Sequence, residues 1–210
     1  AFADAMGIEP VEKPAWQLPL SESDLAKGIT LKQQYGRYGI ICPAASKAER
    51  NWTAEGYAAA AKHLADKNIP VLLCGGPGPL DRTIGDAILA AGAPIKDDLI
   101  GNTTLKELAG VLAEASLVIA PDTGPAHMAT AVNTPVIGLY AHSNPRRTGP
   151  YNNLADVVSV YDQWIEQQAG KPWQALPWGC RAKGEDLMSM ITTEQVNTAI
   201  DTLLNRLESI

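Results

Sequence analysis

Asp122, Thr123 and Gly124 stand together between a short apolar run and a run of small residues. This order is typical of a buried strand, a turn and a helix. Backbone N–H groups at the amino end of a helix are unpaired and face outward, so they bind anions such as phosphate. The Thr123 hydroxyl can add a hydrogen bond, and Gly124 lets a ligand approach the backbone closely. The turn is therefore a candidate phosphate site, although Asp122 or Thr123 could equally serve as a helix cap.

Asp122 and His127 extend this candidate site. A carboxylate does not hold a phosphate, so Asp122 would orient the loop, contact a sugar hydroxyl or bind a metal. His127 lies one helical turn after Thr123, so both side chains can face one cleft. It would hydrogen-bond a phosphate or order the loop, and a purely structural role also remains open. His142, after the next expected strand, is a weaker candidate for the same cleft. The histidines lack the spacing of a zinc site, and we expect no metal.

A second polar loop, which contains Ser46, Lys47 and Arg50, follows another apolar run. The carboxyl ends of parallel strands lie at one edge of a sheet, so this loop should share a rim with Asp122. Arg50 is suited to grip a diphosphate with two parallel hydrogen bonds. Ser46 would assist it, with Lys47 a weaker candidate. The alternative is a solvated loop anchored by Trp52 on the core.

Composition limits the class of protein. The chain has 210 residues and a net charge of −6, which argues against non-specific binding to nucleic acid. No apolar run approaches the roughly 18 residues of a membrane-spanning helix. Cys42, Cys74 and Cys180 lack a CxxC spacing, so we expect free thiols and a reducing cytoplasm.

Short apolar strands that alternate with helices of about 10–15 residues predict an α/β fold with a doubly wound, Rossmann-like parallel sheet covered on both faces. We expect strands at 38–42, 69–74, 99–100, 117–120, 135–140 and 157–160. The main helices are expected at 53–67, 80–91, 104–115, 126–132 and 193–207. A short helix should begin near Ser21 and end at Lys27, and residues 145–151 and 161–180 are expected to be irregular. Residues 1–7 resemble the end of a helix, and 9–21 an extended linker.

The motif at 120–140, followed by the one at 144–151, resembles the signature of the lipopolysaccharide heptosyltransferases, glycosyltransferase family 9. Residues 41–52, 99–108, 178–181 and 190–196 resemble further family motifs. The order and spacing of these motifs hold from about residue 38 to the end of the chain.

The resemblance implies the C-terminal half of a two-domain GT-B glycosyltransferase. It implies that residues 37–210 form the Rossmann-like domain that binds the nucleotide-sugar, with a C-terminal helix. Residues 1–36 would be a linker and the end of an interdomain helix. In this family an N-terminal domain, here outside the sequence, binds the lipid-linked acceptor and supplies the acidic catalytic base. The reaction inverts the anomeric centre and needs no cofactor.

Carried over position by position, the resemblance matches Thr123 and Gly124 to the diphosphate-binding turn. It matches Asp122 and His127 to the acid and histidine beside the donor. Ser46 matches a small hydroxyl residue of the family.

Two positions depart from the family pattern. Arg50 stands where the family usually has a lysine, which keeps the charge and changes its reach. The family often has an acidic residue for the ribose after the second strand, and Asp81 is only an approximate substitute for it.

The expected function is transfer of heptose, or a related sugar, from a nucleotide-diphosphate donor, by this resemblance ADP-heptose, to a lipopolysaccharide core acceptor. The partners would be this donor and lipid A bearing the core oligosaccharide, in the cytoplasm or at the inner face of the inner membrane. Two alternatives stay open: a nucleotide-binding module without catalysis, and a protein similar to a nucleotide-sugar epimerase.

Overall fold

The computed structural model describes residues 5–9 and 17–209. The helix end expected at 1–7 and the linker expected at 9–21 therefore lie largely outside the described residues.

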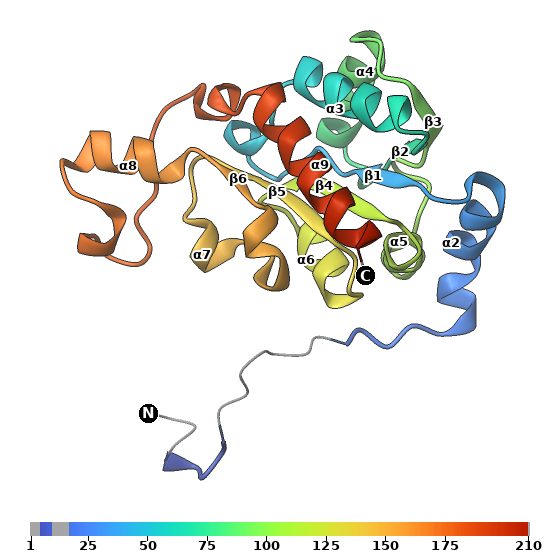
Figure 1. The fold of residues 1–210 in the computed structure, drawn as a ribbon, viewed down its shortest axis with the longest axis horizontal. Coiled ribbons are helices and arrows are strands. Elements are labelled where there is room, and N and C mark those ends of the chain that lie inside the picture. Colours follow the sequence, from blue (N-terminus) through green and yellow to red (C-terminus); the bar gives the residue numbers. More distant parts are fainter. Residues whose placement is uncertain (1–4, 10–16, 210) are drawn as a thin grey trace.

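A six-stranded, fully parallel sheet with the order β3-β2-β1-β4-β5-β6 forms the centre of the fold (Figure 1). Its strands are β1 Gly39–Ile41, β2 Val71–Leu73, β3 Ile95–Asp98, β4 Leu117–Pro121, β5 Val136–Tyr140 and β6 Val158–Ser159. The chain winds outward from β1 to β3, then returns to β4 on the other side of β1. This confirms the expected doubly wound sheet, and the change of direction between β1 and β4 is where such sheets bind ligands.

Helices cover both faces of the sheet (Figure 1). The α-helices are α2 Glu22–Tyr35, α3 Ala54–Asp66, α4 Pro79–Ala90, α5 Leu105–Ala113, α6 Gly124–Ala131, α7 Pro145–Thr148, α8 Tyr161–Ala169 and α9 Thr193–Glu208. The 3-10 helices are η1 Ala48–Arg50, η2 Tyr151–Asp156, η3 Trp173–Ala175 and η4 Leu187–Met190. Side chains of α3, α4 and α9 pack in one apolar core, and side chains of α2, α5 and α6 pack in the other.

Each central strand contributes to both cores. In β1, Ile41 belongs to the core under α3 and α9, whereas Ile40 belongs to the core under α5 and α6. All residues of β1, β2, β4 and β5 are buried. A strand covered on both faces reads as a continuous apolar run, which is why these four strands were recognisable in the sequence.

Helix α2 is longer than expected and ends at Tyr35, not at Lys27. Ser21 and Asp24 form a reciprocal capping box at its start. The backbones of α2 and α5 lie directly against each other. The contact is so close that a Cβ built on Gly28 would stand 2.2 Å from the Gly110 carbonyl oxygen. This part of the expected linker is thus a packed helix, while the domain boundary at 36/37 stays a prediction.

Three further expectations were wrong. The third strand is Ile95–Asp98, not residues 99–100, because this edge strand is mostly polar and carries no apolar run. Residues 161–169 of the segment expected to be irregular form α8, whose N-cap residue is Val160 and whose first N–H, that of Tyr161, donates to Ser159 Oγ. The loop expected at 145–151 contains the single-turn helix α7.

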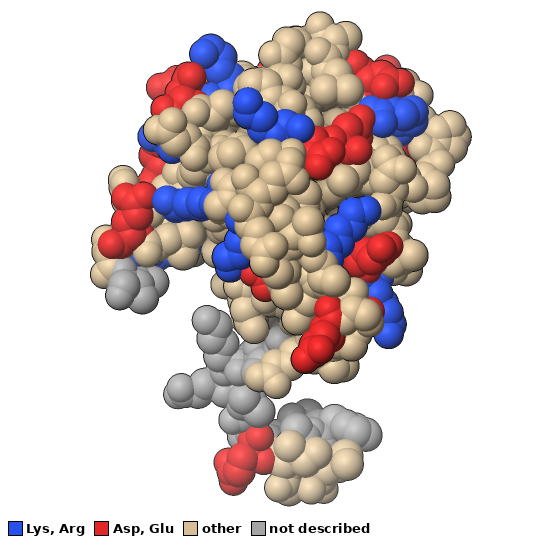
Figure 2. All heavy atoms as spheres, turned by 90° about the vertical axis from the view of Figure 1, so that its right-hand side faces the viewer, with Lys and Arg blue, Asp and Glu red and all other residues tan. Residues whose placement is uncertain are grey.

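Charges of both signs are interspersed on the side of the molecule beside α2 and β3, as Figure 2 shows, so this face carries no large basic field. In the described part of the chain, no helix combines the length and the apolar character needed to cross a membrane.

Candidate functional site

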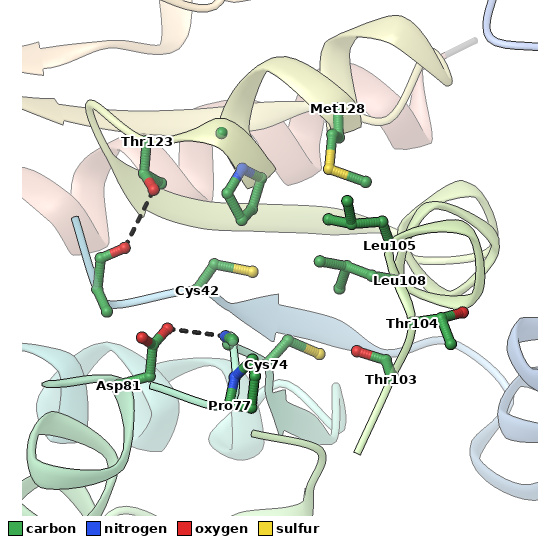
Figure 3. Close-up of a pocket in the computed structure, with 15 residues that line it drawn as sticks. Cys42, Cys74, Pro77, Asp81, Thr103, Thr104, Leu105, Leu108, Thr123 and Met128 are labelled. Atoms are coloured by element: carbon green, nitrogen blue, oxygen red, sulfur yellow. Dashed lines mark hydrogen bonds between the residues drawn. The ribbon is translucent and has the colours of Figure 1, made fainter. Parts of the chain in front are cut away.

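A pocket of about 270 Å³ lies at the carboxyl edge of the sheet (Figure 3). It is formed by the loops after β1, β2 and β4 and by the start of α5. These loops meet at the change of winding direction between β1 and β4. The fold therefore positions this pocket where doubly wound sheets bind their ligands.

One wall of the pocket is apolar. Leu105, Leu108 and Met128 point into it from α5 and α6, and Cys42 and Cys74 lie opposite them on neighbouring strand ends (Figure 3). A hydrogen bond with Cys74, together with burial, raises the pKa of the Cys42 thiol well above its ordinary value. This thiol is therefore neutral at pH 7, and the surface suits a flat, weakly polar ring such as a nucleotide base.

The opposite end of the pocket is polar. Thr123 and Gly124 line it at the amino end of α6, and Asp81 lines it from α4. The Asp81 carboxylate accepts a hydrogen bond of 2.8 Å from the backbone N–H of Gly76. Thr123 is the N-cap residue of α6, as one of the two cap interpretations expected, but among the described residues no side chain accepts a hydrogen bond from the free N–H groups of this helix end. The amino end of this helix stays open to a ligand.

The Thr123 hydroxyl has another partner. It donates a 3.0 Å hydrogen bond to the carbonyl oxygen of Ala44, in the loop after β1. This bond ties the β4 turn to the β1 loop and confirms that the two loops share one rim. In this arrangement the hydroxyl proton is not directed at a ligand, so the expected hydrogen bond from Thr123 to a phosphate would need the side chain to rotate.

Arg50 and Asp122 form an ion pair beside this turn. The Arg50 Nη1 atom lies 3.6 Å from Asp122 Oδ2, and the two side chains are only 15% and 12% exposed. Asp122 Oδ2 also accepts hydrogen bonds from Ser143 Oγ at 2.6 Å and Thr148 Oγ1 at 3.3 Å. Asp122 therefore orients loops, one of the roles expected for it, and brings a cation next to the open helix end.

The buried Tyr140 stabilises the loop that carries Thr148. Its hydroxyl donates a 2.9 Å hydrogen bond to the carbonyl oxygen of Thr148. Burial raises the pKa of Tyr140, and the negative charge of Asp122 raises it further. The phenol is thus a neutral donor that fixes the backbone next to the Thr148 hydroxyl.

Arg50 and Asp122 lie beside the pocket and are not among the residues that line it, and the four remaining predicted residues lie outside the lining as well. Ser46 and Lys47 are exposed on the β1 loop, and His127 is exposed on α6. His142 is buried, with Nδ1 3.1 Å from the carbonyl oxygen of Ala182, so it packs against the C-terminal segment instead of lining this pocket. Roles for these four side chains in binding stay predictions.

The sequence interpretation missed two groups of site residues. Leu105, Leu108 and Met128 looked like the core faces of their helices, because apolar residues at helical spacing serve core and pocket alike. Ser143 and Thr148 follow β5, whose carboxyl end lies on the same rim. That position was the available signal, but the contact with Asp122 depends on how the loop folds back.

No group of three or more His, Cys, Asp or Glu side chains is arranged to hold a metal ion within residues 5–9 and 17–209. That the reaction proceeds without a metal or cofactor stays a prediction.

Comparisons with known proteins agree on one family. The model of glycosyltransferase family 9 (heptosyltransferase) matches residues 1–178. The lipopolysaccharide core heptosyltransferase OpsX of Haemophilus influenzae is 41% identical over 196 residues, which are 93% of this chain and 56% of that protein.

Solved structures share the fold. The ADP-heptose lipopolysaccharide heptosyltransferase II of Escherichia coli matches with a TM-score of 0.68 and 26% identity, over 95% of this chain and 56% of the other. A family 9 glycosyltransferase of Veillonella parvula matches with a TM-score of 0.76 and 20% identity, over 97% and 57% of the two chains. The chain thus spans little more than half the length of the relatives it matches.

Proposed function

The chain belongs to glycosyltransferase family 9, and from this membership we propose that it binds the nucleotide-sugar donor of an inverting heptosyl transfer to a lipopolysaccharide core acceptor. The observation that carries the proposal is the continuity of the site. An apolar pocket large enough for a base leads to the open amino end of α6, and Arg50 stands beside that end. A nucleoside diphosphate has this same order of apolar ring and anionic tail.

ADP-heptose is the donor we propose. The structural relative from Escherichia coli, 26% identical, is described as an ADP-heptose lipopolysaccharide heptosyltransferase. In the pocket, the base would contact Leu105, Leu108 and Met128, and Asp81 would lie near the ribose. The buried cysteine and aliphatic side chains favour a purine ring over a smaller pyrimidine, because the larger ring buries more apolar surface.

The chemistry required of this chain is electrostatic. As the sugar leaves its nucleotide, negative charge builds on the β-phosphate, and Arg50 and the amino end of α6 would stabilise it. The attacking acceptor hydroxyl needs a general base, which we expect outside the 210 residues. We propose that the acceptor, lipid A with its core oligosaccharide, is also bound by groups outside these 210 residues, and that the reaction takes place at the cytoplasmic face of the inner membrane.

Calorimetric titration with ADP, UDP and GDP tests the proposal. We expect ADP to bind most tightly, and Arg50→Ala to weaken ADP binding about tenfold or more, since hydrogen bonds to charged groups contribute about 1.5–3 kcal/mol. Arg37→Ala is the matched control. Arg37 precedes β1, so it lies at the amino ends of the parallel strands, whereas the pocket lies at their carboxyl ends, and it pairs with the exposed Glu208. Absence of binding by all three nucleotides at millimolar concentration would refute the donor site. Unchanged ADP affinity in Arg50→Ala would remove Arg50 from it.

A further inference from the structure

A single carboxylate oxygen, Oδ2 of Asp122, is approached by three groups from two loops. Ser143 Oγ donates to it at 2.6 Å, Thr148 Oγ1 donates at 3.3 Å, and Arg50 Nη1 lies 3.6 Å away. In the described part of the chain, no hydrogen bond reaches the other oxygen, Oδ1. The carboxylate is thus held through one oxygen only.

The three distances show which of these contacts are hydrogen bonds. At 2.6 Å, the Ser143 hydrogen bond is short, as expected for a hydroxyl that donates to a carboxylate. At 3.6 Å, the Arg50 contact exceeds hydrogen-bonding distance, so it is an ion pair without a direct hydrogen bond. The Arg50 Nε atom is also buried without a hydrogen-bond partner among the described residues. The Arg50 guanidinium therefore keeps N–H groups that Asp122 does not use.

Both hydroxyls are held in place by the backbone around them. Ser143 is buried and pairs with Arg181 in an antiparallel β-bridge, and the next residue, Ala182, donates its N–H to the carbonyl oxygen of His142. Thr148 ends the single-turn helix α7, which Asn144 caps, and its carbonyl oxygen accepts the Tyr140 hydroxyl. These loops can hold a carboxylate in one orientation because their own positions are fixed.

We propose that Ser143, supported by Thr148, is a positioning residue for the donor diphosphate. Its hydroxyl, together with that of Thr148, occupies Oδ2 of Asp122 and so prevents a close, two-point pairing of Asp122 with Arg50. The guanidinium then remains available to the diphosphate, and Oδ1 remains available to the ligand. Without the Ser143 hydroxyl, the carboxylate satisfies itself by drawing Arg50 toward it and away from the phosphate. This inference rests on the proposed function of the same site.

The test compares ADP with AMP, because the two ligands share the base and ribose and differ in the β-phosphate. We expect Ser143→Ala to weaken ADP binding about fivefold to tenfold and AMP binding less than twofold, in line with the loss of one charge-assisted contact. Thr148→Val, which keeps the shape of the side chain, should lower the ratio of ADP affinity to AMP affinity by a smaller factor. Ser143→Thr keeps a hydroxyl at this position and should have a ratio close to that of wild type.

Two controls separate positioning from a general structural effect. Thr202→Ala removes an exposed hydroxyl that bonds the Thr198 carbonyl within α9, a helix that contributes no described residue to the pocket lining, and should leave both affinities unchanged. In an Arg50→Ala background, Ser143→Ala should have no additional effect on the ratio of ADP to AMP affinity, because the two residues act through one path. An equal loss for ADP and AMP, or an additive loss in the double variant, overturns the positioning role. If wild type binds no ADP, the proposed function itself fails.

Discussion

At Gly124, binding and stability should respond in opposite directions to one substitution. The residue is the first of α6 and lines the pocket, and a Cβ added there would meet no protein atom within 4 Å. Gly124→Ala should leave the free energy of unfolding unchanged or raise it by about 0.4–1 kcal/mol, because alanine restricts the unfolded chain. The added methyl group would occupy the space in which a phosphate approaches the backbone, so ADP affinity should fall about tenfold.

Denaturant unfolding and calorimetric titration of this one variant check the two halves separately. ADP affinity equal to wild type would mean that no ligand comes close to the backbone at this turn. A clear loss of stability would mean that the turn, not the ligand, requires glycine at position 124.

The same turn shows how much of the site a sequence can predict. That Arg50 and Asp122 share a rim followed from strand order alone, because the carboxyl ends of parallel strands meet at one edge. The bond from Thr123 to Ala44, and those from Ser143 and Thr148 to Asp122, could not be predicted, since they depend on side-chain rotation within loops. Loop positions carry no periodic signal comparable to that of helices and strands.

At the scale of elements, the crossing of α2 and α5 depends on two glycines. A Cβ on Gly28 would lie 2.2 Å from the Gly110 carbonyl oxygen, and one on Gly110 would lie 2.0 Å from the Asp24 carbonyl oxygen. The clashing atoms belong to the backbone, so relief requires the helices to separate. We expect Gly28→Ala to destabilise the fold by about 1–3 kcal/mol, although alanine alone favours a helix by about 1 kcal/mol over glycine.

Gly179→Ala is the matched control for this prediction, because a Cβ there meets nothing within 4 Å. Urea unfolding of both variants gives the comparison. Equal stabilities for Gly28→Ala and wild type would show that α2 does not need its close approach to α5.

Elements that are buried on two sides were predictable, and those at edges were not. The apolar runs of β1, β2, β4 and β5 gave these strands directly, whereas β3, at the edge of the sheet, is largely polar. Helix α8 was missed because its N-cap residue, Val160, has no capping side chain and because three of its nine residues are glutamine. The alternation along the central strands was sufficient for the doubly wound topology, because connections between parallel strands have a preferred hand.

At the scale of the whole molecule, the two apolar cores share the same sheet. In β2, Leu73 packs into the core under α3 and α9, while its neighbour Leu72 packs into the core on the opposite face. Neither core can lose its strands without exposing the other. We therefore expect the 210-residue chain to unfold in one cooperative transition, with equal calorimetric and van't Hoff enthalpies.

Two neighbouring substitutions test this coupling. Leu72→Ala and Leu73→Ala each leave a cavity on a different face of the sheet and should each cost about 2–5 kcal/mol. If the cores are coupled, either variant lowers the midpoint of the single transition seen by calorimetry and by near- and far-ultraviolet circular dichroism alike. A separate early transition in one variant would instead mean that the core on that face melts alone. The apolar pocket residues Cys42, Cys74, Leu108 and Met128 belong to the core under α2, α5 and α6. If the two cores melted independently, ADP would raise the midpoint of that core's transition alone, whereas a single cooperative unit must shift as a whole.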